Sequence, residues 1–318
     1  MSIKFSVILP NGATNELAGI VDPVEAYETM THVAQTAEEV GFDAIFLSDV
    51  LWPGDFTGQD ASQQLLFECW TTTAALARDT SRVRIGQIVT SNVFRHPALL
   101  AKMASTVDVM SHGRLTLGIG SGSPALADQA RAYGYEYPDV PQRSRQLREA
   151  IQILLAMWTQ QEATFEGTSY VVRGAINQPK GIQQPHIPLL IAGNGEHVTL
   201  KLVAQYADAC NVHGDPATLK HKFAVLKAHC ERLGRDYQSI HRTSGSYCIM
   251  GETDEQAQAH VPERVRALFG NAALIGSPAT IRERIAAYEE AGVQELLLRF
   301  PGSGQPDAIR RFAQEFIA

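Results

Sequence analysis

The chain has 318 residues, of which 45% are hydrophobic and 19% are charged. This composition excludes a disordered or collagen-like chain and supplies a large core. Lysine and arginine number 27 against 34 aspartate and glutamate residues, a formal net charge of −7. Because an acidic surface repels phosphate backbones and no apolar run approaches the ~20 residues that span a bilayer, we expect a cytoplasmic protein without nucleic-acid or membrane partners.

Eight short apolar runs, each followed by a longer segment, are expected to form strands. They are near-continuous rather than alternating, which is typical of strands buried on both faces of a parallel sheet. Several intervening helices are expected to begin at a capping residue followed by proline, namely at Asp22, His96, Asp215 and Ser277. The expected strands begin at Ile3, Ala44, Val83, Leu115, Leu189, Ala209, Thr243 and Glu295.

Repeated strand–helix alternation predicts an α/β fold, a (β/α)8 TIM barrel forming one domain over residues 1–318. The surplus length is assigned to insertions near 160–188, with a small hairpin and a lid-like loop, and near 251–275. An open doubly wound sheet is the alternative, but it needs a glycine-rich dinucleotide turn after the first strand. The sequence there reads ILPNGATNEL and lacks that turn.

The four cysteines (Cys69, Cys210, Cys230 and Cys248) have no paired spacing. Sparse, unpaired cysteines in a chain of this length predict no disulfide framework and fit a reducing compartment. We expect each thiol to behave as a small buried hydrophobic group.

Chemistry in this fold gathers where the strands end. Those ends are mostly glycine, serine, asparagine and threonine, and Asp49 is the only carboxylate among them. No histidine or carboxylate cluster has metal spacing, so no metal is expected. The lack of a strand-end lysine disfavours a Schiff-base aldolase, and a single carboxylate disfavours a glycosidase. The strand ends form the mouth of the barrel. A mouth with few ionisable side chains suits a bound cofactor that supplies the reactive group itself.

Two glycine segments are candidates for holding that cofactor. Gly120 and Gly122 either let a flat ring approach the backbone or form a plain tight turn. The segment 193–195 precedes a helix expected to begin at Glu196. Its N–H groups would suit a phosphate, and a simple helix entry is the alternative.

Five side chains near the expected mouth are further candidates. His213 closes the sixth strand and can reach the cavity. His96 precedes a helix-starting proline and either has a functional role or only shapes that loop. Arg95 and Arg299 either bind an anionic group or form salt bridges at the rim. Trp52 either walls the site or packs as a loop aromatic.

The chain resembles the bacterial luciferase-like family of flavin- and deazaflavin-dependent oxidoreductases. The blocks RHPALLAKMA and SHGRLTLGIGSG are the specific ones, and the similarity extends over nearly the whole chain. Further matching segments are GFDAIFLSD, RAYG, ATFEGTSY, PLLIAGNGEHVTLKLVAQYADACNV and GSPATIRERIAAYEEAGVQELLL.

The resemblance implies a cofactor in the barrel mouth, its phosphate near the loop after the fifth strand, and a non-proline cis peptide around Val89–Ser91. Segment 214–236 resembles the branch that uses coenzyme F420. The residues themselves do not separate F420 from FMN, since both are phosphorylated tricyclic rings. The expected cofactor-binding residues are Asp49, Val89, Thr90, Ser91, Asn92, Gly120, Ser121, Gly122, Ala192, Gly193, Asn194 and Gly195.

Two positions depart from relatives that oxidise sugar phosphates. Val50 stands where they carry histidine after the second-strand aspartate, and Ser123 follows the glycine turn where many relatives carry tryptophan. The substrate therefore does not carry over. The expected catalytic residues are Asp49 and His213, and the expected substrate pocket comprises Asn11, Trp52, Ser123 and Arg299.

The sequence thus predicts an F420-dependent oxidoreductase that moves a hydride to or from a small organic substrate. One alternative is an FMN-dependent monooxygenase supplied with reduced flavin by a partner reductase. Another is a flavin-binding protein without turnover, because the mouth lacks an evident acid–base pair. The family analogy also suggests a homodimer.

Overall fold

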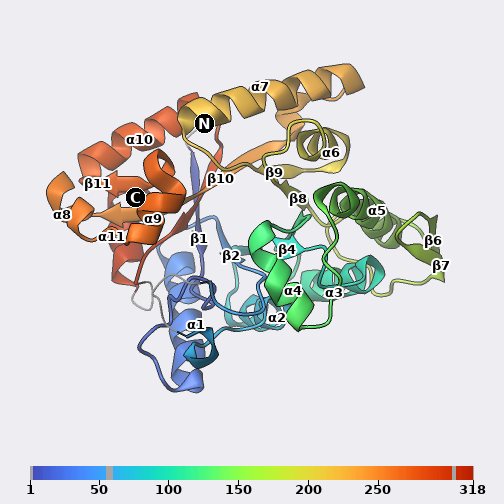
Figure 1. The fold of residues 1–318 in the computed structure, drawn as a ribbon, viewed down its shortest axis with the longest axis horizontal. Helices are drawn as coiled ribbons and strands as arrows, with labels where there is room; N and C mark the ends of the chain where they lie inside the picture. The colour runs from blue at the N-terminus through green and yellow to red at the C-terminus, as the bar shows by residue number, and fades with distance from the viewer. Residues whose placement is uncertain (1–2, 55–59, 303–305, 318) are drawn as a thin grey trace.

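Eight parallel strands close into a barrel with helices packed outside it (Figure 1). The computed structural model describes residues 3–54, 60–302 and 306–317. The last barrel strand pairs with the first, and the predicted (β/α)8 barrel is confirmed. In order around the barrel, the strands are β1 (Lys4–Ile8), β2 (Ala44–Leu47), β3 (Arg84–Gln87), β5 (Leu115–Gly120), β8 (Leu189–Ala192), β9 (Ala209–Asn211), β10 (His241–Met250) and β12 (Glu295–Arg299).

Two short strands extend this sheet at its carboxyl edge. Strand β4 (Thr90–Ser91) pairs with β5, and β11 (Leu274–Gly276) pairs with β10. The third expected strand is therefore split into β3 and β4. The break contains a cis peptide between Ile88 and Val89, at the start of the segment where the resemblance implied one.

The expected capping residues begin their helices. The side chains of Asp22, His96, Asp215 and Ser277 each accept a hydrogen bond from a backbone N–H in the first turn, before a proline. The helices that they start are α1 (Pro23–Glu39), α3 (Pro97–Met110), α7 (Pro216–Leu233) and α10 (Pro278–Glu290). The others are α2 (Cys69–Asp79), α4 (Ala127–Ala132), α5 (Val140–Thr159), α6 (Thr199–Tyr206), α8 (Asp254–Ala259), α9 (Glu263–Phe269) and α11 (Asp307–Phe316).

Helix α6 begins later than the sequence suggested. Residues 196–198 form a turn, and regular helix starts at Thr199 rather than at Glu196. The Glu196 carboxylate reaches across to α7, where it accepts from Lys222 at 2.7 Å and lies 3.0 Å from His221. Segment 193–195 is thus separated from the helix by one turn.

The two insertions lie at opposite ends of the molecule (Figure 1). The first contains the expected hairpin, with β6 (Ala163–Glu166) antiparallel to β7 (Val171–Ala175). Its turn is held on α5 by the Glu149 carboxylate, which accepts from the backbone of Thr168, Ser169 and Tyr170 at 2.8–3.1 Å. The second insertion contains α8 and α9.

All four cysteines are buried free thiols, as predicted. Burial raises the thiol pKa of Cys210 to about 12. Within the described residues, no helix is long and apolar enough to cross a bilayer.

Candidate active site

A cavity of about 640 Å³, here called the central pocket, opens at the carboxyl ends of the barrel strands. This is the end at which enzymes of this architecture carry their sites. Its volume lies within the ~300–1,000 Å³ that is usual for small-molecule sites. Its lining residues are Ser48, Asp49, Val50, Ile88, Val89, Thr90, Ser91, Gly120, Ser121, Gly122, Ser123, Leu126, Val140, Ser144, Ala192, Gly193, Asn194, Gly195, Glu196, His197, Val198, Thr199 and His213.

The expected cofactor-binding residues line this pocket, with the exception of Asn92. Asn92 is buried, and its side-chain nitrogen donates to the Tyr170 hydroxyl at 3.3 Å, which ties the loop after β4 to the hairpin. Of the expected substrate residues, only Ser123 lines the central pocket.

Backbone forms much of the pocket wall at two of the glycines. A Cβ at Gly120 would lie 2.9 Å from a methyl carbon of Val89. Gly122 has φ +81°, and a Cβ there would lie 2.7 Å from the Tyr137 hydroxyl. A side chain at either position would therefore displace a neighbour, and glycine leaves the backbone accessible to a ligand.

Ser91 provides an unpaired polar group in the same wall. Its hydroxyl oxygen is buried and has no hydrogen-bond partner in the structure. Because buried polar atoms are nearly always hydrogen-bonded, this oxygen calls for a ligand or a water molecule. The bare glycine backbone beside it and the pocket's volume fit a flat, phosphorylated ring.

Asp49 lines the pocket with its carboxylate already bound. Arg95 donates to both carboxylate oxygens, at 2.6 and 3.1 Å, and the Ser91 amide donates to one of them at 3.0 Å. Burial raises the pKa of the Asp49 carboxyl group, and these donors oppose that shift. Arg95 also binds Glu68 at 2.5 Å. Asp49 therefore anchors the loop after β4, and both of its carboxylate oxygens are already hydrogen-bonded.

Arg299 is buried beside the mouth but does not line the central pocket. It forms an ion pair with Glu16 and donates to Ser48 at 2.9 Å and Thr14 at 3.2 Å. Burial lowers its pKa to about 10, so it stays charged at neutral pH. Arg299 thus holds the loop after β1, which is the salt-bridge alternative considered for it.

Asn11 and Trp52, the other expected substrate residues, also lie outside the central pocket. Asn11 donates to the carbonyl oxygen of Ser48 at 2.9 Å and joins the loops after β1 and β2. The backbone of Trp52 pairs with the side chain of Gln129 at the start of α4, and its ring lies 6.4 Å from that of Tyr133. Both residues shape the mouth from behind.

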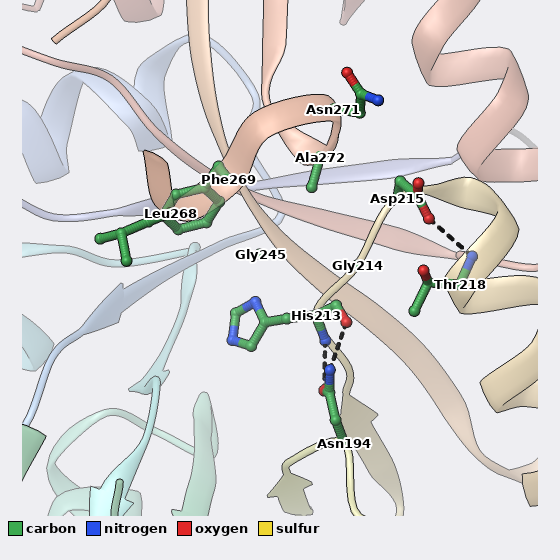
Figure 2. A pocket seen from close by; sticks show the side chains of 10 residues that line it. All are labelled: Asn194, His213, Gly214, Asp215, Thr218, Gly245, Leu268, Phe269, Asn271 and Ala272. Carbon is green, nitrogen blue, oxygen red and sulfur yellow. Dashed lines mark hydrogen bonds between the residues drawn. The ribbon is translucent and has the colours of Figure 1, made fainter. Parts of the chain in front are cut away.

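A second cavity of about 680 Å³, here called the side cavity, adjoins the central pocket (Figure 2). His213 and Asn194 line both. Four of its residues come from the second insertion, in which the sequence singled out no individual site residue. Its lining residues are Asn194, His213, Gly214, Asp215, Thr218, Gly245, Leu268, Phe269, Asn271 and Ala272.

His213 is held at the boundary of the two cavities. The Asn194 carboxamide accepts from the His213 N–H at 2.9 Å and donates to its carbonyl oxygen at 2.7 Å. The imidazole lies against Gly245, where a Cβ would come within 2.9 Å of ring carbon Cε1. Desolvation by the surrounding protein lowers the His213 pKa, although solvent in the cavity reaches the side chain. The imidazole is therefore neutral at pH 7.

These features agree with comparisons to known proteins. The family described as luciferase-like monooxygenase matches residues 3–272. The chain belongs to this family. The resemblance inferred from its sequence blocks is thereby confirmed.

Relatives of this luciferase-like protein include two F420-dependent glucose-6-phosphate dehydrogenases. The one from Microbacterium testaceum is 30% identical over 312 residues, covering 88% of this chain and 90% of the relative. The one from Beutenbergia cavernae is 34% identical over 319 residues, with the same coverage of 88% and 90%.

Solved structures share the barrel. An F420-dependent secondary alcohol dehydrogenase, in complex with an F420–acetone adduct, superposes with a TM-score of 0.78 at 20% identity, covering 100% of this chain and 97% of that one. A long-chain alkane monooxygenase gives 0.81 at 16% identity, covering 99% and 90%. At these identities the likeness establishes the fold alone.

Proposed function

We propose that this protein is an oxidoreductase that uses coenzyme F420 to move a hydride to or from a small organic substrate. The observation that carries the proposal is the central pocket, whose wall combines bare backbone at Gly120 and Gly122 with the unpaired Ser91 hydroxyl. The names of the curated relatives support F420 over FMN.

The residues of the pocket divide between the two parts of such a cofactor. The Gly193 amide donates to the Asn211 carbonyl oxygen at 3.0 Å, so the phosphate contacts are assigned to the amides of Asn194 and Gly195 and to the Thr199 hydroxyl. Ser91 and the backbone around Gly120 are assigned to the ring. A bound deazaflavin supplies the hydride acceptor or donor at this site.

His213 is the proposed proton-transfer residue. It is neutral at pH 7, and its imidazole lies against Gly245 at the boundary of the two cavities. A neutral imidazole at this boundary can accept or return a proton near neutral pH. Asp49 is proposed to act through Arg95 and Ser91, as a positioning residue.

Titration of the purified protein with F420 and with FMN tests this proposal. We expect F420 to bind at micromolar concentration and FMN to bind much more weakly. Calorimetry and the absorbance of each ring system measure the two affinities. Binding of FMN but not of F420 would overturn the cofactor assignment and favour an FMN-dependent monooxygenase with a separate reductase. Binding without turnover over a broad substrate panel would favour a binding protein.

The variant Gly193→Asp tests the phosphate site. A carboxylate beside the phosphate should weaken F420 binding by roughly tenfold or more, because like charges repel. Gly19→Asp is the matched control, since Gly19 also has a positive φ and a Cβ added there would meet no atom within 4 Å. Equal affinity in both variants would remove segment 193–195 from the site.

We further propose that the protein acts in the cytoplasm as a homodimer. The four buried thiols suit a reducing compartment, and the dimer follows from the family analogy. Sedimentation at several protein concentrations tests the dimer, and a monomer throughout the range would contradict it.

A further inference from the structure

The side cavity is placed to hold a substrate beside a cofactor in the central pocket. His213 and Asn194 line both spaces, so a molecule in one lies next to a molecule in the other (Figure 2). The side cavity also has a wall that the central pocket lacks, because its outer side is formed by α9 and the turn after it.

The charge of this cavity opposes an anionic substrate. Within the described part of the chain, neither lysine nor arginine lines the side cavity. The sequence at 55–59 (DFTGQ) and 303–305 (SGQ) contains none either. The one carboxylate lining the side cavity, among the described residues, belongs to Asp215.

Asp215 occupies the anion position at the start of α7. Its carboxylate accepts from the Thr218 amide at 2.9 Å, and the side-chain and backbone hydrogen bonds of Thr218 lower its pKa. The carboxylate is therefore ionised at neutral pH. A helix start that already holds an anion repels a second one.

Arg284 of α10 is a cation in contact with this wall, but it does not line the cavity. Its guanidinium donates to the backbone carbonyl oxygen of Asn271, and Arg284 is not among the lining residues. Arg284 therefore contributes no side chain to the lining that a substrate in the cavity would contact.

The opposite wall is apolar. Leu268 and Phe269 lie across the cavity from Asp215 and Thr218 (Figure 2). Leu268 is 59% exposed, so it has apolar surface available to be covered by a ligand. Asn271 and Thr218 add polar groups to the lining. Apolar walls with a few polar groups are typical of small-molecule sites, and the lining described here adds no cation for an anionic ligand.

We propose that the side cavity binds the substrate, and that this substrate is an uncharged alcohol or carbonyl compound rather than a phosphorylated sugar. The inference rests on the proposed function, since it takes the central pocket for the cofactor. The inference predicts that this chain differs in substrate class from the glucose-6-phosphate dehydrogenases that it resembles.

Calorimetric titration of the F420-loaded protein tests the charge preference. The probes are cyclohexanol, 1-phenylethanol and glucose, set against glucose 6-phosphate. We expect at least one uncharged probe to bind roughly tenfold more tightly than glucose 6-phosphate. Tightest binding of glucose 6-phosphate would overturn the inference, and its loss in Arg284→Gln would then identify the phosphate partner.

A filling variant tests the location. Leu268→Trp places a large ring in the side cavity and should weaken the best uncharged probe by roughly tenfold while leaving F420 affinity unchanged. Leu99→Trp is the matched control, because Leu99 is 56% exposed on α3 and lines neither cavity. Equal probe binding in both variants would place the substrate elsewhere.

The charge of Asp215 gives an independent test. Asp215→Asn keeps a residue that caps helices well and removes the negative charge, so glucose 6-phosphate should bind several-fold more tightly. Asp22→Asn makes the same change at the start of α1 and should have no effect. If glucose 6-phosphate binds no more tightly to Asp215→Asn than to the native chain, the Asp215 charge does not repel the phosphate.

Failure of this inference can be distinguished from failure of the proposed function. If F420 does not bind to the protein at all, the proposed function fails. If F420 binds with the affinity expected but glucose 6-phosphate binds more tightly than the uncharged probes, only the inference of an uncharged substrate in the side cavity fails.

Discussion

Strand β12 places a buried charge at each end of the barrel, and the two charges have different partners. Glu295 at the amino end contacts side chains from three other barrel strands: the Ser6 hydroxyl, His241 at 2.6 Å and Arg84 at 3.2 Å. Arg299 at the carboxyl end binds the loops after β1 and β2 instead. One end therefore joins strand to strand, while the other holds the loops that surround the site.

This difference predicts that the two ends serve different purposes. Closure of the barrel is a matter of stability, whereas the loops at the carboxyl end carry chemistry in this architecture. Changes near Glu295 should therefore alter unfolding and leave ligand binding intact. Changes near Asp49 and Arg299 should alter ligand binding and cost less stability than changes near Glu295.

The largest effect is expected from Glu295→Gln. Removing one partner from a buried ion pair costs about 3 kcal/mol, because His241 and Arg84 lose the charge that holds them. Urea unfolding should report this loss, and the folded variant should bind F420 with unchanged affinity. A loss of cofactor affinity without a loss of stability would refute the assignment of this end to the scaffold.

Lowering the pH should destabilise the protein through the same Glu295 carboxyl group. Desolvation by itself raises the pKa of Glu295, but His241, Arg84 and Ser6 together outweigh it and lower that pKa to about 2 from an ordinary 4.5. A depressed carboxyl pKa gives stability that is present above pH 4.5 and is lost as the pH falls from about 4.5 toward 2. Unfolding midpoints measured over this range should fall steeply in the native chain and more gently in Glu295→Gln.

Asp49→Asn should have its larger effect on the cofactor. Arg95 would lose its main partner and keep Glu68, so the loop carrying Ser91 would be held less firmly. We expect roughly a tenfold weaker F420 affinity and a stability loss of about 1 kcal/mol. Glu68→Gln is the control, because it removes the other carboxylate from Arg95 at an exposed position. Equal losses of affinity would remove the special role of Asp49.

The smallest effect is expected from Arg299→Lys. Lysine keeps the charge beside Glu16 but cannot also reach Ser48 and Thr14 as the planar guanidinium does. A several-fold change in the KM of the best substrate, with a stability loss of about 1 kcal/mol, would place Arg299 among the loop-holding residues. A loss as large as that in Glu295→Gln would make the two ends of the barrel equivalent.

The sequence predicted those features that local chemistry determines. Apolar runs located the barrel strands, and the Asp215–Pro216 and Ser277–Pro278 pairs located helix starts. Strand-end residues such as Gly120 and Ser121 line the pocket because carboxyl ends of parallel strands meet at one edge.

What the sequence did not predict depends on partners far away along the chain. Arg299 pairs with Glu16, which lies 283 positions earlier in the chain, and so does not line the central pocket. Asn92 likewise hydrogen-bonds to Tyr170 in the hairpin. Helix α6 starts at Thr199 rather than at Glu196, and the Glu196 carboxylate binds Lys222 of α7. The side cavity was missed because Leu268 and Phe269 carry no local signal of a binding wall.

The carboxamide of Asn194 has a consequence for motion in the mouth. By pairing with both the N–H and the carbonyl of His213, it reproduces the hydrogen-bonding pattern of a strand neighbour beyond the last residues of β8 and β9. The loops after β8 and β9 are thereby joined by two hydrogen bonds. Separating the loop after β8 from the loop after β9 would therefore cost both of these hydrogen bonds, which lie where the two cavities adjoin.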